Sequence, residues 1–305
     1  MARGFHGPAP VAHSAHVLVA ALALGALGVF IAACAGASRA RRAAVLMLAL
    51  SSLAITASVP EELVFARGLF ALANLLFLMR AIDLVRERES SPFSVRLALM
   101  FVVYDARETR ACVPRLPRVL FVQGLAFATL AVVSLWAALH SARGLFTWLF
   151  GTVFVYSSAD AAQRLTTAFH RARGVVIPPQ HENPILSRSV AEFWSRRWNI
   201  NVSTWLRRHW YRPLAERGYP RAGLAAAFFV SALFHWWLIH VPLGWSASLP
   251  MAVFFLVQAA LIFVERALGL GRRATWQRHA WTVGVMLSTS PLFVSPFLSV
   301  FASLV

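Results

Sequence analysis

The feature that most constrains this chain is a series of eight apolar runs, each about as long as a membrane-spanning helix. Crossing the hydrocarbon core of a bilayer takes about 20 predominantly apolar residues, with a range of roughly 17–25. Runs of this kind lie at 15–35, 43–59, 63–80, 118–139, 144–160, 222–241, 247–264 and 280–302. Because the bilayer core offers the backbone no water, each run is expected to be helical. The sequence therefore predicts an all-α integral membrane protein, a single polytopic domain over residues 1–305 with about eight transmembrane helices.

Composition supports a membrane protein and argues against a nucleic-acid partner. Of the 305 residues, 59% are hydrophobic and 13% are charged, whereas a soluble domain carries about 25% charged residues. The net charge is +17, and all 29 basic residues are arginine. In a soluble protein such an excess would indicate nucleic-acid binding. Here the arginines gather between the apolar runs, so we expect the lipid bilayer, and no nucleic acid, as a partner.

The arginines also predict an orientation. Arginine-rich connections at 36–43, 81–117, 161–221 and 265–279 alternate with connections that carry little positive charge. Positively charged loops stay in the cytoplasm, so we expect a multi-pass protein of the cell inner membrane with both termini outside the cytoplasm. Arg3 is the only charge before the run 15–35, whereas three arginines follow it within 36–43, which is the reverse of a cleaved signal peptide. We therefore expect this run to be retained.

The segment 178–221 differs from the rest of the chain because aromatic residues and arginines alternate along it. Ser189 and Glu192, three residues apart, have the spacing of a capping box and predict that a helix starts there. The residues that follow are Phe193, Trp194, Ser195, Arg196, Arg197, Trp198 and Asn199. One interpretation is an amphipathic helix that lies in the membrane interface and anchors the bundle. The other is that the arginines hold an anionic group such as a phosphate through charge-assisted hydrogen bonds.

Polar residues inside the apolar runs are the other candidates for function. His235 lies well within the run 222–241, and an ionisable residue at that depth is costly and points to function. A neutral imidazole is suited to moving a proton near neutral pH; the alternative is a histidine that bonds a neighbouring helix. Asn74 is expected either to line a cavity or to bond another helix. Arg80 and Asp83 have the spacing of a local ion pair.

Taken together, these motifs resemble the wax synthase branch of the membrane-bound O-acyltransferases. The resemblance is carried by the run from Phe193 to Asn199, by Leu206-Arg207, by Tyr211-Arg212-Pro213, and by His235, 36 residues after Asn199. The segment Arg80-Ala81-Ile82-Asp83-Leu84 is similar to an arginine-aspartate segment of the same branch. The chain departs from the pattern at Trp236, where relatives often have a glutamate after the histidine.

The resemblance implies an enzyme that moves an acyl group from acyl-CoA, its co-substrate, to a hydroxyl group, with no metal and no other cofactor. The first expected acceptor is a long-chain alcohol, which would give a wax ester; the alternative is acetyl or acyl transfer to a natural-product or sugar hydroxyl. His235 would be the general base, and Asn199 would orient the acceptor or stabilise developing negative charge. The expected substrate-binding residues are Arg196, Arg197, Trp194 and Trp198.

A lipid transporter or lipid-binding membrane protein is the rival class, because many-helix topology alone fits it. Transporters often show repeated halves with broken helices at corresponding positions. In this chain the polar features are concentrated in the motif region 178–241, and the first half of the sequence has no counterpart. This asymmetry favours an enzyme.

Overall fold

A computed structural model describes residues 9–36, 38–87, 91–141 and 144–304. The predicted position of both termini outside the cytoplasm concerns residues 1–8 and 305, which lie outside these ranges. The described chain is mostly helical and falls into two compact units. The first is built mainly from residues up to Ala106, and the second mainly from the rest. Whether the chain acts as one domain stays a prediction.

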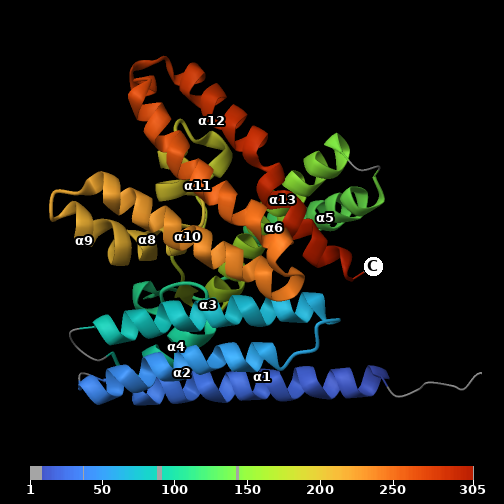
Figure 1. The fold of residues 1–305 in the computed structure, drawn as a ribbon, viewed down its shortest axis with the longest axis vertical. Coiled ribbons are helices and arrows are strands. Elements are labelled where there is room, and N and C mark those ends of the chain that lie inside the picture. The colour runs from blue at the N-terminus through green and yellow to red at the C-terminus, as the bar shows by residue number, and fades with distance from the viewer. Residues whose placement is uncertain (1–8, 37, 88–90, 142–143, 305) are drawn as a thin grey trace, which may run out of the picture. The chain divides into compact units, whose positions relative to one another are not determined.

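The first unit is a layer of long helices with an apolar core. Its elements are α1 (Ala9–Cys34), α2 (Arg39–Ala57), α3 (Val64–Arg86) and the short α4 (Phe93–Phe101). The helices α1, α2 and α3 run side by side, with α2 packed against both others (Figure 1). Ile31, Val45 and Leu99 are essentially fully buried between these helices. The first three apolar runs predict three neighbouring helices, and these helices pack on one another through apolar residues.

Polar groups inside the first unit are bonded within it. The Asn74 amide on α3 accepts a hydrogen bond from the Thr56 hydroxyl on α2 and donates one to the Ser52 carbonyl at 2.9 Å. Asn74 therefore bonds a neighbouring helix, which was one of its two expected roles. Arg80 and Asp83 are both buried and form the expected local ion pair, with 3.3 Å between nitrogen and oxygen.

The second unit contains the remaining long helices and most of the short elements. The long helices are α5 (Arg118–His140), α6 (Leu145–Ala172), α10 (Pro220–Leu243), α11 (Trp245–Ala267), α12 (Thr275–Thr289) and α13 (Pro291–Ala302). The short elements are η1 (Ala106–Glu108), β1 (Arg110–Ala111), β2 (Val175–Val176), η2 (Pro184–Leu186), α7 (Val190–Glu192), η3 (Phe193–Arg197), α8 (Ile200–Leu206), η4 (Arg207–Tyr211), α9 (Arg212–Ala215) and η5 (Leu270–Arg272). The two strands pair antiparallel.

Two glycines allow α13 and η4 to approach their partner helices closely. A Cβ on Gly151 of α6 would lie 2.4 Å from a side-chain carbon of Val294 on α13, too close unless that side chain moved. A side chain on Gly223 of α10 would begin 2.6 Å from the carbonyl oxygen of Tyr211 in η4. The helix α6 also packs along α5 as an antiparallel hairpin. These contacts hold the helices that surround the motif segment in position.

Six single helices are long and apolar enough to cross a membrane: α1, α2, α3, α5, α10 and α11. The pair α12 and α13 meets the same criteria together but is bent by 46° at its break, which raises the number to seven within the described residues. The run 144–160 lies in α6, where Ser157, Ser158 and Asp160 interrupt the apolar sequence. The all-α, multi-pass membrane protein is confirmed, and the count of eight spans is not.

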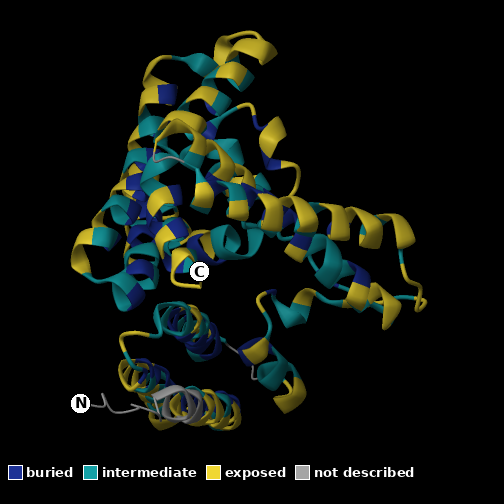
Figure 2. Cartoon of the chain, turned by 90° about the vertical axis from the view of Figure 1, so that its right-hand side faces the viewer, coloured by how far each residue is buried: buried dark blue, intermediate teal, exposed yellow. Residues whose placement is uncertain are grey.

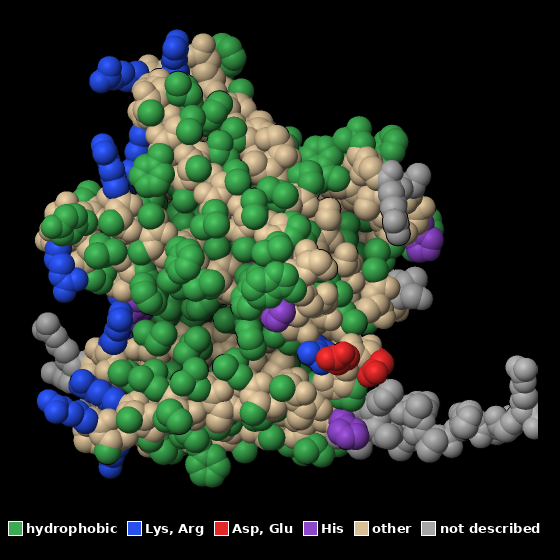
Figure 3. Space-filling view, in the orientation of Figure 1, with side chains coloured by type: hydrophobic (Ala, Val, Ile, Leu, Met, Phe, Trp, Pro, Cys, Tyr) green, Lys and Arg blue, Asp and Glu red, His purple; other side chains and the backbone are tan. Residues whose placement is uncertain are grey.

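The outer surface of the long helices is apolar, as a bilayer requires. Leu18 and Leu22 on α1 and Val132 and Trp136 on α5 are each more than 60% exposed. Figure 2 shows buried residues on the inner sides of the helices and exposed ones along their outer sides, and Figure 3 shows hydrophobic side chains over much of one face. Exposing so large an apolar area to water would be unfavourable, whereas lipid solvates it.

Candidate active site

The motif segment begins as predicted and then departs from a regular α-helix. The Ser189 hydroxyl caps α7 by accepting the Glu192 N–H at 2.9 Å. The Glu192 carboxylate accepts the Arg188 N–H at 2.9 Å, one residue earlier than a full capping box requires. The chain then forms a π-helix, η3, followed by α8 and a second π-helix, η4. Such π-helical turns are rare and are frequently found at functional sites.

The loop that precedes α7 is held against the end of η3. On α6, the Gln163 side chain accepts the Gln180 N–H at 2.9 Å and donates to the His181 carbonyl at 3.0 Å. The Ile200 N–H in turn donates to the Gln180 carbonyl at 2.8 Å. The loop, α6 and the start of α8 therefore form one connected structure around Asn199.

His181 fixes the backbone of Asn199 directly. Its Nδ1 accepts the Asn199 N–H at 3.1 Å, and its ring packs against Trp198 with 4.7 Å between centroids. Burial lowers the pKa of His181, although the nearby Asp160 charge acts in the opposite direction. The ring is therefore neutral near pH 7, as an accepting Nδ1 requires.

Asn199 has a structural role that its residue type explains. Its φ of +43° lies in the left-handed region, where asparagine is tolerated better than most residues. It is also the N-cap of α8, with its side-chain oxygen 3.5 Å from the Val202 nitrogen. A turn and a cap at the same residue direct the Asn199 side chain into a cavity that it shares with α10.

His235 lies in that cavity with its ring fixed on two sides. Its Nδ1 is 2.8 Å from the Ser231 carbonyl, one turn earlier on α10. A carbonyl only accepts, so Nδ1 carries the hydrogen and Nε2 holds the lone pair. The ring also stacks on Phe255 of α11 with 3.8 Å between centroids. The tautomer and the plane of His235 are thus set before any ligand binds.

The structure brings four of the six predicted site residues to this one cavity of about 280 Å³. These are His235, Asn199, Trp194 and Trp198, which come from α10, the turn before α8, and the η3 segment. Two exposed arginines, Arg207 of η4 and Arg266 of α11, also line the cavity. The sequence marked Arg207 through the Leu206-Arg207 step. Nothing in the spacing singled out Arg266, which enters the site only because α11 packs beside α10.

The other two predicted residues, Arg196 and Arg197, are not among the described residues that line this cavity. Arg196 is exposed. Arg197 pairs with Glu192 at 2.7 Å and donates to the Glu182 carbonyl at 3.1 Å. Burial alone would raise the pKa of Glu192, but the Arg188 amide and the Arg197 guanidinium hold it below its usual value. Arg197 therefore connects the loop to η3.

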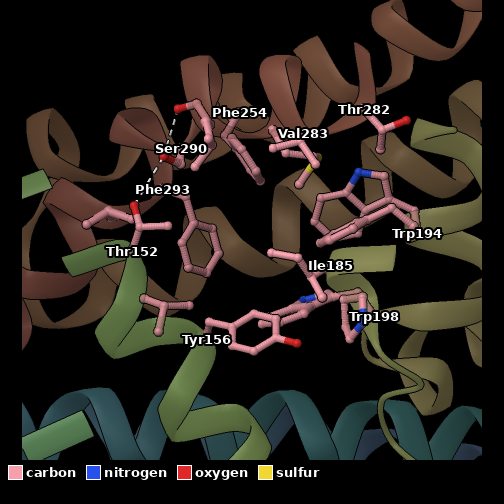
Figure 4. A pocket seen from close by; sticks show the side chains of 16 residues that line it. Thr152, Tyr156, Ile185, Trp194, Trp198, Phe254, Thr282, Val283, Ser290 and Phe293 are labelled. Carbon is pink, nitrogen blue, oxygen red and sulfur yellow. Dashed lines mark hydrogen bonds between the residues drawn. The ribbon is translucent and has the colours of Figure 1, made fainter. Parts of the chain in front are cut away.

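A second cavity, of about 160 Å³, lies beside the first and shares Trp194 and Trp198 with it (Figure 4). Its other walls come from α6, η2, α11, α12 and α13, and most of them are apolar. In Figure 4 the two tryptophans lie on the side of the cavity opposite Thr152 and Ser290. The motif segment thus forms a wall of both cavities.

The arrangement is suited to moving a proton in a water-poor site. A neutral imidazole whose Nε2 holds the lone pair can accept a proton from a hydroxyl. The Asn199 amide offers a donor for developing negative charge. Arg207 and Arg266 offer cationic forks for an anionic group. Apolar walls surround these groups and suit a hydrocarbon chain.

Comparison with known proteins identifies relatives of this segment. Residues 177–257 match the membrane bound O-acyl transferase family. "Probable long-chain-alcohol O-fatty-acyltransferase 1" of Arabidopsis thaliana is 34% identical over 130 residues, which cover 38% of this chain and 36% of the relative. "Probable long-chain-alcohol O-fatty-acyltransferase 2" of Arabidopsis thaliana is 29% identical over 160 residues, covering 50% and 44%. "Diacylglycerol O-acyltransferase 1" of Homo sapiens is 38% identical over 78 residues, covering 22% and 16%. The chain thus spans less than half the length of these relatives.

The two roles of Asn199 predict different outcomes for two substitutions. Asn199→Gly keeps a residue that accepts positive φ and costs only a few tenths of a kcal/mol as an N-cap. Asn199→Ala loses the cap and strains the left-handed backbone, so we expect it to lower the stability by about 1–3 kcal/mol. The measurement is the thermal midpoint in detergent. Equal midpoints for the two variants would contradict the backbone described here.

Proposed function

We propose that this chain is an acyl-CoA-dependent O-acyltransferase that makes wax esters from long-chain alcohols, because residues 177–257 match the membrane bound O-acyl transferase family. The observation that carries the proposal is the placement of His235 and Asn199 in one cavity with apolar walls. Relatives named for long-chain-alcohol acyl transfer align over more of the chain than the diacylglycerol acyltransferases do. Apolar walls also favour a hydrocarbon acceptor over a sugar.

In the proposed reaction the acceptor hydroxyl donates its proton to Nε2 of His235 as its oxygen attacks the thioester carbonyl. The C–O bond forms, and the C–S bond then breaks. The proton returns from the imidazolium to the CoA sulfur, which leaves as the thiol. The Asn199 amide orients the acceptor or donates to the oxygen that gains negative charge. The Ser231 carbonyl helps by accepting Nδ1–H from the imidazolium.

The acyl-CoA donor brings phosphates, which need cations outside the apolar part of the cavity. Arg207 and Arg266 are exposed and border the cavity, and arginine pairs well with phosphate. We propose that these two residues bind the CoA phosphates next to the cavity. Arg196, exposed on the neighbouring η3, is the third arginine that we propose to bind the phosphates, outside the cavity lining. Arg197 contributes mainly by holding the loop 180–184 in place.

The orientation of the chain follows from its charge pattern. We propose that the arginine-rich segment 161–221 faces the cytoplasm, where acyl-CoA is made available, and that both termini lie on the other side of the cell inner membrane. The CoA-binding arginines would then meet their ligand on the correct side.

Replacing His235 tests the proposed function. The assay presents purified protein with labelled acyl-CoAs and a panel of alcohols, read by mass spectrometry. His235→Gln keeps volume and some hydrogen bonding but no basicity, so turnover per folded molecule should fall by about 10²–10⁴-fold. Monodispersity in detergent is the control. A well-folded Gln variant that keeps more than about a tenth of wild-type turnover, a loss far below that range, would show that His235 is not the base.

Substituting the arginines one at a time distinguishes residues that bind acyl-CoA from residues that hold the loop in position. Arg207→Ala and Arg266→Ala should each raise the KM for acyl-CoA, with kcat little changed, because each removes a charge-assisted contact worth about 1.5–3 kcal/mol. Arg196→Ala should have a smaller effect in the same direction. Arg197→Ala should instead lower the thermal midpoint, since it unties the loop. An unchanged KM in both Arg207→Ala and Arg266→Ala would exclude them from CoA binding.

Reporter fusions test the orientation. A reporter inserted within 161–180 should be active on the cytoplasmic side, and one fused after Val305 should be active on the opposite side. Finding the internal reporter outside the cytoplasm would refute the orientation, because that segment belongs to the most arginine-rich connection.

A further inference from the structure

The partition between the two cavities is built on one side chain, Trp194. Its indole lines both the His235 cavity and the second cavity. Trp198 is the other residue common to both. Behind them, Phe255 faces the first cavity and its neighbour Phe254 faces the second. The indole of Trp194 packs against both phenylalanines, at 5.4 Å from Phe255 and 6.0 Å from Phe254.

Trp194 is held in place by a buried amide. Gln258 on α11 is fully buried. Its oxygen accepts the Trp194 indole N–H at 3.3 Å, and its NH₂ donates to the Thr289 hydroxyl at 2.9 Å. The Thr289 hydroxyl donates to the Val285 carbonyl at 2.7 Å. Since the indole only donates, the donor and the acceptor of each hydrogen bond in this series are determined.

The network also reaches the proposed base. Trp194 packs on Phe255, and Phe255 stacks on His235 with 3.8 Å between ring centroids. The partition therefore stands one aromatic ring away from the reacting atoms. Gln258 itself lines neither cavity among the described residues, so any effect it has on substrates passes through the position of Trp194.

We propose that Gln258 and Trp194 determine which hydrocarbon chain the enzyme accepts. With the indole bonded to Gln258, the partition closes the His235 cavity and limits the chain length that fits. When the indole is released or shortened, the second cavity joins the first and a longer chain becomes the better substrate. This inference rests on the proposed acyl transfer. The chain in question belongs to the acyl donor or to the alcohol, and the experiment below separates the two.

The size of the effect follows from the burial of methylene groups. Each CH₂ that moves from water into an apolar site gains about 0.8 kcal/mol, which is about fourfold in kcat/KM. A released partition should therefore raise the ratio of kcat/KM for long against short chains by about fourfold for each additional methylene that the joined cavity buries.

The experiment measures kcat/KM in two series with full-length protein. One series varies the acyl-CoA length at a fixed alcohol, and the other varies the alcohol length at a fixed acyl-CoA. The variants are Gln258→Met, which keeps volume but loses both hydrogen bonds, Trp194→Phe, which loses the N–H and part of the wall, and Thr289→Val. Thr289 lines neither cavity among the described residues, so Thr289→Val reaches Trp194 through Gln258, besides losing its own bond to the Val285 carbonyl.

Two further variants serve as controls. Gln258→Glu, protonated in this buried site, keeps an acceptor for Trp194 and a donor for Thr289, so its length profile should stay close to that of wild type. Asn74→Leu removes a buried amide of the first unit that bonds Thr56 and Ser52. It should lower stability without changing the length profile, and so it measures the effect of losing a buried amide as such.

The expected result is a shift toward longer chains in Gln258→Met and Trp194→Phe, a smaller shift in Thr289→Val, and none in the two controls. The series that shifts identifies whether the acyl donor or the alcohol occupies the joined cavity. Unchanged profiles in both series, in active Gln258→Met or Thr289→Val protein, would overturn the inference and leave the proposed function intact. Wild-type protein that transfers no acyl group to any alcohol would overturn both.

Discussion

The hydrogen bond from the Asn199 N–H to Nδ1 of His181 is the interaction on which the site depends. It holds a left-handed residue between a π-helix and an α-helix, and positive φ persists there only because its surroundings fix it. Gln163 holds the loop that carries His181, and Arg197 ties the same loop to η3. This bond thus fixes the backbone from which the Asn199 side chain caps α8 and reaches the cavity.

Two buried amides, Asn74 and Gln258, link neighbouring elements of this protein. Lipid tails are as apolar as leucine, so hydrophobic burial does not by itself choose one helix arrangement over another within a bilayer. Asn74 links α3 to α2, and Gln258 links α11 both to α12 and to Trp194 of the motif segment. Each amide is satisfied at both ends, which avoids the cost of an unpaired polar group in an apolar interior. The hydrogen bonds of Gln258 therefore link two helices and also hold Trp194, which lines both cavities.

The motif segment combines the two interpretations that its composition left open. Its aromatic residues pack inward, as Trp194 does on Phe228 and Phe255, and its arginines divide between structure and ligand. Arg197 is engaged by Glu192, while Arg207 borders the cavity. Arg196, two residues after Trp194, faces away from it because residues i and i+2 do not share a helix face. Arg197 is directed to Glu192 and to the Glu182 carbonyl rather than to the cavity that Trp194 and Trp198 line.

The order of residues alone predicts an all-α membrane protein, because apolar runs of spanning length have no other stable arrangement in lipid. It also identified the Ser189 cap, the Arg80–Asp83 pair and the candidates His235 and Asn199, whose signals lie in residue type and spacing. The tertiary structure alone placed Arg266 on the cavity and bonded Gln258 to Trp194. It also brought His181 to the backbone of Asn199. These features depend on contacts between residues far apart in the chain, which local spacing does not encode.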